Sequence, residues 1–347
     1  MKEELLAKNI LSVIQGYRNE DGISLDIDHI LAWANQFGDD SLFVLGELNH
    51  IMPKIYVSKE RAIQYTEQHL SWLTGKYGYH SFNEFLMDTH FLRLQTEGKS
   101  QLAIIELVAE IIQKKYQVSL EQYITYPKRN YVYFDDVLAT GSTLGRHIVD
   151  WLNSSDGAGK MIDRILADKY RLSINLFCLH TWGKSFQTYR LNKEIDEKVD
   201  KKITWMHNYL VENHARFPNQ AFNNAFPIQM QPINIQSYLS NLSATKYANY
   251  AYRNVNMPQF ENFFSSKENR IRYENIILQK GLYIIGMIKG ELKPNIRPLG
   301  LINPSYKTFG LGTHFVTWRN IPNNCPLVYW WEVPGHDWIP LFPRKVV

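Results

Sequence analysis

Cysteine is scarce in this chain of 347 residues: there are two, Cys178 and Cys325, far apart and in no C-x-x-C pair. This scarcity argues against a disulfide framework and a cysteine-ligated zinc site, and it favours a reducing compartment. Long hydrophobic runs are also absent, since the longest, around LYIIGMI, is far shorter than the roughly 20 residues that span a bilayer. The start, MKEELLAKNI, is too polar for a signal peptide. We therefore expect a cytoplasmic protein without a membrane partner.

A strong charge bias is missing as well. The chain has 38 Lys and Arg against 34 Asp and Glu, a formal charge of +4, which tolerates a polyanionic partner without requiring one. The 11 histidines form no H-E-x-x-H or other metal-ligand spacing, so no structural zinc is predicted. Internal repeats and low-complexity tracts do not occur. A hydrophobic content of 45% is enough for a large core, divided into two or so lobes.

What the chain does contain is an alternation of helix-like and strand-like segments. Trp33 and Phe37 share one face of a helical pattern near the start. Further on, 89–95 and 172–182 have the composition of strands, and 102–116 that of an apolar helix. Strand, loop and helix in succession predict an α/β fold with a parallel sheet, because parallel neighbours need a long crossover. Ligands in such folds bind at the carboxyl ends of the strands.

By composition the chain divides into four segments. Residues 1–85 are an N-terminal helical layer and 86–185 the α/β core, followed by a mainly helical insertion or hood over 186–285 and a mixed C-terminal extension over 286–347. Gly281 is expected to cap a helix at its C-terminal end.

The C-terminal extension is rich in aromatic residues at strand-like spacing, and two interpretations stay open. The rings are core residues, or they form a lid or base-stacking wall in which Arg319 or Arg344 reaches a phosphate. The rings concerned are Trp318, Tyr329, Trp330, Trp331, Trp338 and Phe342.

The most specific chemistry lies in YVYFDDVLATGSTLGRHIVDWL, residues 131–152. Asp135 and Asp136 follow an apolar strand, and the small-residue turn 140–143 precedes a helix with one apolar face. Unpaired N–H groups and hydroxyls of the turn suit a phosphate monoester, and Gly141 permits close approach. The carboxylates would repel a phosphate but accept hydrogen bonds from ribose hydroxyls. Together they describe a 5-phosphoribosyl site, although each piece alone is more often a polar strand end or a helix cap.

This string resembles the 5-phosphoribosyl-1-pyrophosphate (PRPP) motif of type I phosphoribosyltransferases: an apolar strand, Asp-Asp or Glu-Asp, three variable positions, then Thr-Gly-Ser/Gly-Thr. The resemblance implies a Rossmann-like parallel-sheet core that binds PRPP or a nucleotide. Asp135 and Asp136 would hold the ribose hydroxyls and act in catalysis. Mg²⁺ would be the cofactor, held mainly by substrate oxygens, with these two aspartates as the candidate protein ligands. The residues implied for the ribose 5-phosphate are Ala139, Thr140, Gly141, Ser142 and Thr143.

The same family binds pyrophosphate in a loop after the preceding core strand, where this chain has TEGKS. The residues implied are Thr96, Glu97, Gly98, Lys99 and Ser100, and Lys99 would act in catalysis by offsetting the pyrophosphate charge.

The triplet GKS, at 98–100 and again at 183–185, also suggests a Walker A loop. Its first glycine would fall at Arg93 or Cys178, which argues against a P-loop nucleotidase.

His180 and Lys184, which lie at the end of the third predicted strand, are candidates for acid, base or phosphate contact. The alternative is a packing role for His180 and an ordinary solvated side chain for Lys184.

The outer motifs WANQF, FLRLQTEGKSQ, WRNIPNNCPLVYWW and WIPLFPR resemble a bacterial group of phosphoribosyltransferase-like proteins associated with conflict and defence. This implies an antiphage effector encoded with modules such as retron-type reverse transcriptases. Its partners would be a phosphoribosyl-containing small molecule and a reverse transcriptase or nucleic-acid defence complex. Three functions stay open: an enzyme acting at C1', a non-catalytic nucleotide sensor, and a nucleic-acid-binding subunit with a vestigial core. The acceptor, the reaction direction and homo-oligomer formation stay open too.

Overall fold

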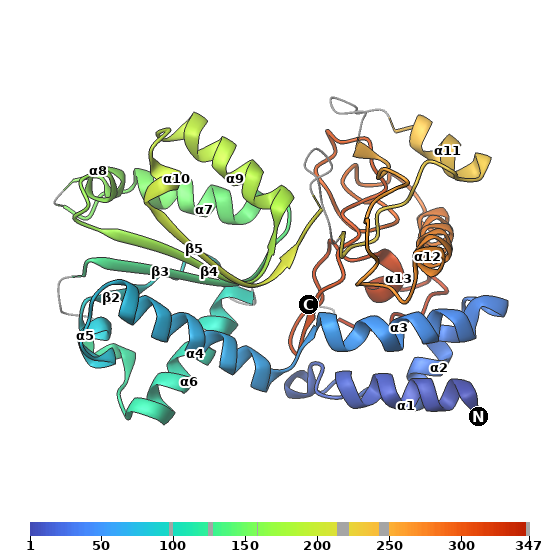
Figure 1. Ribbon diagram of the computed structural model, residues 1–347, viewed down its shortest axis with the longest axis horizontal. Helices are drawn as coiled ribbons and strands as arrows, with labels where there is room; N and C mark the ends of the chain where they lie inside the picture. The colour runs from blue at the N-terminus through green and yellow to red at the C-terminus, as the bar shows by residue number, and fades with distance from the viewer. Residues whose placement is uncertain (97–99, 124–127, 158, 214–221, 243–249, 345–347) are drawn as a thin grey trace. The chain divides into compact units, whose positions relative to one another are not determined.

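The structure is a computed structural model that describes residues 1–96, 100–123, 128–157, 159–213, 222–242 and 250–344. The chain forms two compact units, which are coloured along the chain in Figure 1. Unit 1 combines Met1–Lys59 with Val211–Val347, whereas unit 2 is the continuous segment Glu60–Leu210. The aspartate pair and the turn that follows it lie in unit 2.

Unit 2 is built on a four-stranded sheet in the order β2-β3-β4-β5. β2 pairs parallel to β3, and β3 parallel to β4, with Asp135 opposite Leu176. Every residue of β4 except Arg171 is buried, as expected for a strand that is covered on both faces. The predicted α/β fold with a parallel sheet is confirmed. The strands are β2 (Thr89–Phe91), β3 (Asn130–Leu138), β4 (Arg171–His180) and β5 (Ile203–Val211).

Helices cover both faces of this sheet. In Figure 1, α4 and α6 lie on one face and α7 and α9 on the other. The core beneath α7 contains Tyr133 and Ile174 from the strands and Leu144, Ile148 and Leu152 from the helix. Because this apolar side of α7 packs on the sheet, the start of the helix is fixed at the end of β3. The helices of unit 2 are α4 (Lys59–Lys76), α5 (Phe82–Met87), α6 (Ser100–Tyr116), η3 (Leu120–Tyr123), α7 (Ser142–Asn153), α8 (Met161–Leu166), α9 (Thr181–Glu194) and α10 (Val199–Lys202).

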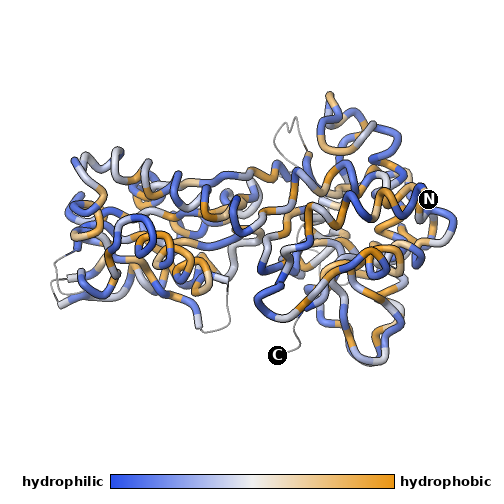
Figure 2. The backbone as a smooth tube through the Cα atoms, turned by 90° about the horizontal axis from the view of Figure 1, so that it is seen from below, coloured by the Kyte–Doolittle hydropathy of each residue, from blue (hydrophilic) through white to orange (hydrophobic). Residues whose placement is uncertain are grey.

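Unit 1 joins the two ends of the chain around aromatic side chains. Trp33 donates its indole N–H to the Val328 carbonyl at 2.8 Å and stacks on Tyr329 at 6.0 Å between ring centroids. Tyr17 and Phe342 meet edge to face at 5.0 Å. Figure 2 shows apolar and polar stretches alternating along the helices, as amphipathic helices with one buried side require. The elements of unit 1 are α1 (Lys2–Ile14), η1 (Asn19–Asp21), α2 (Ile27–Asn35), η2 (Gly38–Asp40), α3 (Ser41–Ile55), α11 (Ile233–Ser240), α12 (Lys267–Gly286), α13 (Leu327–Trp330) and the parallel pair β1 (Tyr56–Val57) and β6 (Val316–Thr317).

A buried ion network crosses the interior of unit 1. Arg270 of α12 pairs with Glu261 and Glu274, and Arg253 pairs with Glu274 at 3.0 Å. Each of these side chains is at most 4% exposed. Buried charges are tolerated where they are paired and hydrogen-bonded, so this network fixes the position of α12 against the loop that carries Glu261.

Two expectations for the second half of the chain are wrong. LVYWW is not a strand, because Leu327–Trp330 forms the short helix α13. Gly281 does not cap α12 but lies inside it, where a Cβ would come within 2.6 Å of the Pro298 carbonyl oxygen. The region taken as mainly helical also contains strand β5, which completes the sheet of unit 2.

The six C-terminal rings are core residues, since each is between 1% and 8% exposed. Arg344 is engaged inside unit 1 too: its guanidinium lies 4.1 Å from the centroid of the Trp330 ring and donates to the carbonyl of Ile321. The core interpretation is therefore the one that burial supports.

Candidate functional site

The aspartate pair lies within strand β3 rather than after it, because β3 continues to Leu138. Gly141 follows in the left-handed conformation with φ of 76°, and α7 begins at Ser142. A glycine is required here because residues with a Cβ rarely adopt this backbone geometry. The sequence TGST is therefore half turn and half helix, with Ser142 and Thr143 in the first turn of α7.

This start of α7 has the properties of an anion site. The first N–H groups of a helix have no partner inside it and carry a partial positive charge. Ser142 and Thr143 are exposed, and the hydroxyl oxygens of Thr140 and Ser142 lie 3.4 Å apart. N–H groups and hydroxyls are thus presented together at the surface beside the end of β3.

Asp135 is buried and accepts four hydrogen bonds. Ser100 Oγ and the Asp136 backbone N–H donate to its Oδ1, each at 2.9 Å. Gln95 Nε2 and the Tyr133 hydroxyl donate to its Oδ2 at 2.8 and 2.9 Å. The pKa of Asp135 is raised to about 7, mainly by burial and secondly by the charge of Asp136. The hydrogen-bond donors around it lower the pKa but do not offset these two effects. Asp135 therefore links strand β3 to both ends of the TEGKS loop.

Asp136 occupies a different environment from Asp135. Side chains alternate along a strand, so Asp136 lies on the same face as Phe134 and opposite Asp135. Both aspartates are nearly buried, at 5% and 4% exposure. The pair is consequently two separate groups and not one dicarboxylate clamp.

The TEGKS loop is held at its start by a residue that the sequence did not single out. Gln101 Oε1 accepts the backbone N–H groups of Leu94 and Gln95 at 2.9 and 2.8 Å, and Gln101 Nε2 donates to the Leu92 carbonyl at 2.9 Å. Gln101 is fully buried. Of the predicted pyrophosphate residues, Thr96 and Ser100 are described, whereas Glu97, Gly98 and Lys99 lie outside the described residues.

Gln95, Gln101 and Tyr133 are the site residues that the sequence reasoning missed. Tyr133 had a signal, since it stands two positions before Asp135 on the same strand face. The two glutamines flank the TEGKS loop but belong to no recognisable sequence motif, because their roles depend on hydrogen bonds that exist only in the folded chain.

The two candidates after the third strand have local partners. His180 is fully buried at the end of β4, and burial lowers its pKa to about 3, so its imidazole is neutral near pH 7. Lys184 of α9 pairs with Asp200 at 2.7 Å, donates to Thr188 at 2.9 Å and lies 4.3 Å from the Trp205 ring. The lysine thus ties α9 to α10 and β5.

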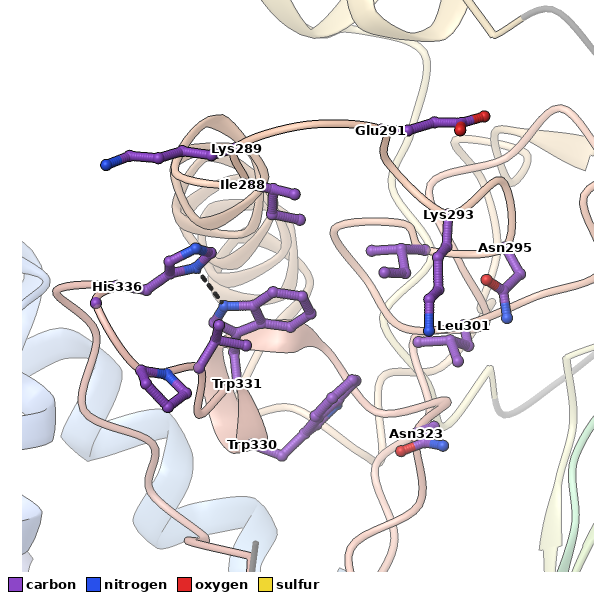
Figure 3. A pocket seen from close by; sticks show the side chains of 14 residues that line it. Ile288, Lys289, Glu291, Lys293, Asn295, Leu301, Asn323, Trp330, Trp331 and His336 are labelled. Atoms are coloured by element: carbon purple, nitrogen blue, oxygen red, sulfur yellow. Dashed lines mark hydrogen bonds between the residues drawn. The ribbon is translucent and has the colours of Figure 1, made fainter.

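Two cavities among the described residues do not coincide with this site. One of about 650 Å³ lies in unit 1 (Figure 3), and one of about 520 Å³ lies along Thr89–Leu94 in unit 2. Neither is lined by Asp135, Asp136 or residues 139–143. A phosphate held by a helix start needs exposed N–H groups rather than an enclosed cavity, so the chemistry and not the volume identifies the candidate site.

The unit 1 cavity offers few polar groups that converge. The indole N–H of Trp331 is already bonded to His336 Nδ1 at 3.0 Å, as Figure 3 shows. Lys289 and Glu291 point away from the rings, whereas Lys293 extends toward Leu301. A phosphoribosyl site needs an anion-binding turn at a helix start, and this lining contains no helix start of the kind formed by Gly141 and Ser142.

The donor set near Asp135 is chemically compatible with Mg²⁺ that is held mainly by a substrate. Mg²⁺ prefers oxygen ligands and is usually bound by one or two carboxylates together with phosphate oxygens and water. Four hydrogen bonds already use the acceptor capacity of Asp135. No group of three or more His, Cys, Asp or Glu side chains suited to a metal occurs in the described part of the chain.

Among the described residues, no helix combines the length and apolar character that a membrane crossing requires.

A parallel α/β sheet, with acidic residues in one strand and a glycine turn leading into the next helix, defines a phosphoribosyltransferase-like protein. Residues 30–344 match the model of the PRTase-CE family, a phosphoribosyltransferase-type family, and the chain belongs to it. No curated protein and no solved structure matches the chain.

Proposed function

We propose that unit 2 binds PRPP or a nucleotide through its 5-phosphoribosyl group. The observation that carries this proposal is the left-handed Gly141, placed between the acidic end of β3 and the exposed first turn of α7. Ala139, Thr140, Gly141, Ser142 and Thr143 bind the 5'-phosphate.

In this proposal the two aspartates have different roles. Asp136 accepts hydrogen bonds from the ribose hydroxyls and contributes to a Mg²⁺ site that substrate oxygens complete. Asp135 is a positioning residue, because its four hydrogen bonds hold the TEGKS loop against β3. The pyrophosphate is bound by that loop, in which Thr96 and Ser100 are joined by Glu97, Gly98 and Lys99.

The proposed reaction is transfer or hydrolysis at C1'. The bond from C1' to the leaving group breaks, its electron pair departs with that group, and a base nitrogen or a water oxygen forms the new bond and then loses its proton. Mg²⁺ supplies charge neutralisation for the leaving group. Asp136 offsets the positive charge that develops on the ribose, and the N–H groups of the two loops hold the phosphates in place.

A non-catalytic sensor is the alternative that one observation favours. Both carboxylates are at most 5% exposed, and Asp135 is already saturated with internal donors. Binding through the exposed turn alone would need neither carboxylate to reach the ligand.

We further propose a role in bacterial antiphage defence, as effector or regulatory subunit of a retron-type complex. This rests on the resemblance of the outer motifs in both halves of the chain. The family match, over residues 30–344, likewise includes parts of both units, so unit 1 is part of what the family shares.

The test is to incubate the protein with PRPP, Mg²⁺ and a mixture of nucleotides and nucleobases, and to follow consumption by mass spectrometry. For an enzyme, Asp136→Asn abolishes turnover, whereas Asp150→Asn, at an exposed carboxylate of α7, leaves it unchanged. Binding without turnover across the whole panel would support the non-catalytic sensor instead of the enzyme. Absence of both binding and turnover would overturn the phosphoribosyl proposal itself.

A further inference from the structure

Helix α9 packs directly against the back of the proposed phosphate turn. Gly183, Gln187 and Arg190 recur at i, i+4 and i+7, which places them on one side of the helix. Each contacts the backbone of residues 139–145. This stripe has no role in the chemistry described so far.

The central contact is made by the side chain of Gln187, which is 1% exposed. Its Nε2 donates to the Gly141 carbonyl oxygen at 2.5 Å. The same oxygen accepts the Gly145 backbone N–H at 2.8 Å. The Gly141 carbonyl is therefore held by two donors, one from α7 and one from α9.

Two glycines make room for this amide. A Cβ on Gly141 would lie 2.0 Å from Gln187 Nε2, and one on Gly145 would lie 2.1 Å from Gln187 Oε1. Gly145 lies inside α7, where glycine costs about 1 kcal/mol relative to alanine. The close approach of Gln187 explains why a glycine is found there.

The other two residues of the stripe lie close to neighbouring carbonyls. A Cβ on Gly183 would come within 2.3 Å of the Ala139 carbonyl oxygen, so only glycine lets α9 approach so closely. Arg190 Nη1 donates to the Ser142 carbonyl oxygen at 3.5 Å.

Peptide geometry converts these contacts into a property of the phosphate site. The C=O of one residue and the N–H of the next share a rigid plane and point in opposite directions. Holding the carbonyls of Gly141 and Ser142 on the α9 side directs the N–H groups of Ser142 and Thr143 to the other side.

We propose that Gln187 is a positioning residue for the 5'-phosphate turn: it sets the direction of the turn's N–H groups through the Gly141 carbonyl, without touching the ligand. This inference rests on the proposed function and adds to it the residue on which phosphate affinity depends.

The experiment measures binding of ribose 5-phosphate and, separately, inorganic pyrophosphate by calorimetry on the full chain. Gln187→Met retains the side-chain length but loses the N–H donor, and it is expected to weaken ribose 5-phosphate binding about 10-fold. Pyrophosphate binding should not change, because Ser100, a described residue of the TEGKS loop, hydrogen-bonds Asp135 of β3 and not the Gly141 turn. Asn192→Ala, at an exposed amide of the same helix, is the matched control and should bind both ligands like the wild type.

Gly145→Ala tests the packing independently. Its methyl group collides with Gln187, so ribose 5-phosphate binding and the melting temperature should both fall. In Gly145→Ala/Gln187→Ala the space is free, so the melting temperature should recover, whereas ribose 5-phosphate binding should stay as weak as in Gln187→Met because the amide donor is absent. Equal ribose 5-phosphate affinity in wild type and Gln187→Met, equal loss for both ligands, or wild-type ribose 5-phosphate affinity in the double variant would each overturn the inference. A wild type that binds neither ligand would overturn the proposed function instead, before any variant is compared.

Discussion

At the scale of single residues, Asp135 is a carboxyl group removed from water and surrounded by donors. Burial disfavours its charged form and raises its pKa to about 7, while hydrogen bonds from Tyr133, Ser100 and the Asp136 N–H act in the opposite direction. The group therefore changes its charge near neutral pH. Its charge state affects the same loop that is proposed to bind pyrophosphate.

A stability change with pH follows from this shift. In the unfolded chain an aspartate loses its proton near pH 4, whereas Asp135 in the folded chain keeps its proton up to about pH 7. The unfolded state therefore binds fewer protons at this position in this window, so the contribution of Asp135 to stability is greatest below pH 4 and falls as pH rises to 7. For wild type relative to Asp135→Asn, we expect the free energy of unfolding to fall by a few kcal/mol over that window.

Urea denaturation of both proteins at a series of pH values measures this difference. The contributions of other titrating groups cancel when the two proteins are compared. Asp150→Asn, at an exposed carboxylate, should show the same dependence of unfolding free energy on pH as the wild type. A wild-type curve that stays parallel to that of Asp135→Asn between pH 4 and 7 would contradict the raised pKa.

At the scale of elements, α9 is held from two sides. Gln187 attaches it to the turn before α7, and Lys184 attaches it to α10 and β5 through Asp200 and Trp205. Lys184 and Asp200 are 25% and 17% exposed, so solvent screens their pairing only in part.

Lys184→Met is expected to loosen α9 without changing the phosphate site. Loss of the pair and of the cation–π contact should cost about 1 kcal/mol, which lowers the melting temperature of a unit of this size by about 2–4 °C. Ribose 5-phosphate affinity should remain within about twofold of wild type. Lys193→Met, at an exposed position of the same helix, is the control for melting. A large loss of affinity in Lys184→Met with unchanged melting would instead make Lys184 a phosphate ligand.

At the scale of the whole molecule, each unit has its own interior: an apolar cluster under α7 in unit 2, and an aromatic core with a buried ion network in unit 1. Removing Arg270 leaves Glu261 and Glu274 with less compensation for their buried charges. Such losses cost about 3–5 kcal/mol.

Arg270→Met should therefore lower the melting temperature of unit 1 strongly. Differential scanning calorimetry is expected to show the shift, and Arg272→Met, which removes an exposed pairing with Asp40 on the same helix, should change melting little. Addition of PRPP should still raise the melting temperature of unit 2 in Arg270→Met, since the proposed site lies within Glu60–Leu210. Comparable melting of the two variants would show that the network contributes little.

Local pattern was enough to predict much of unit 2. Strands β2, β3 and β4 and helices α6 and α7 were expected near their observed positions, because buried apolar runs and amphipathic periodicity are local properties. The aspartate pair and Gly141 were found for the same reason, as a contiguous string. Strand β5 and helix α13 were missed, since their residues are only half-buried or aromatic and carry no clear period.

The sequence by itself determined the α/β class, the acidic strand end and the glycine turn, because each depends on neighbouring residues. Only the tertiary structure decided that Gln95, Ser100 and Tyr133 share one carboxylate, and that Gln187 holds the turn from the α9 side. Those contacts join residues up to 46 positions apart, and such pairs are fixed by how helices and strands pack, which no local pattern contains.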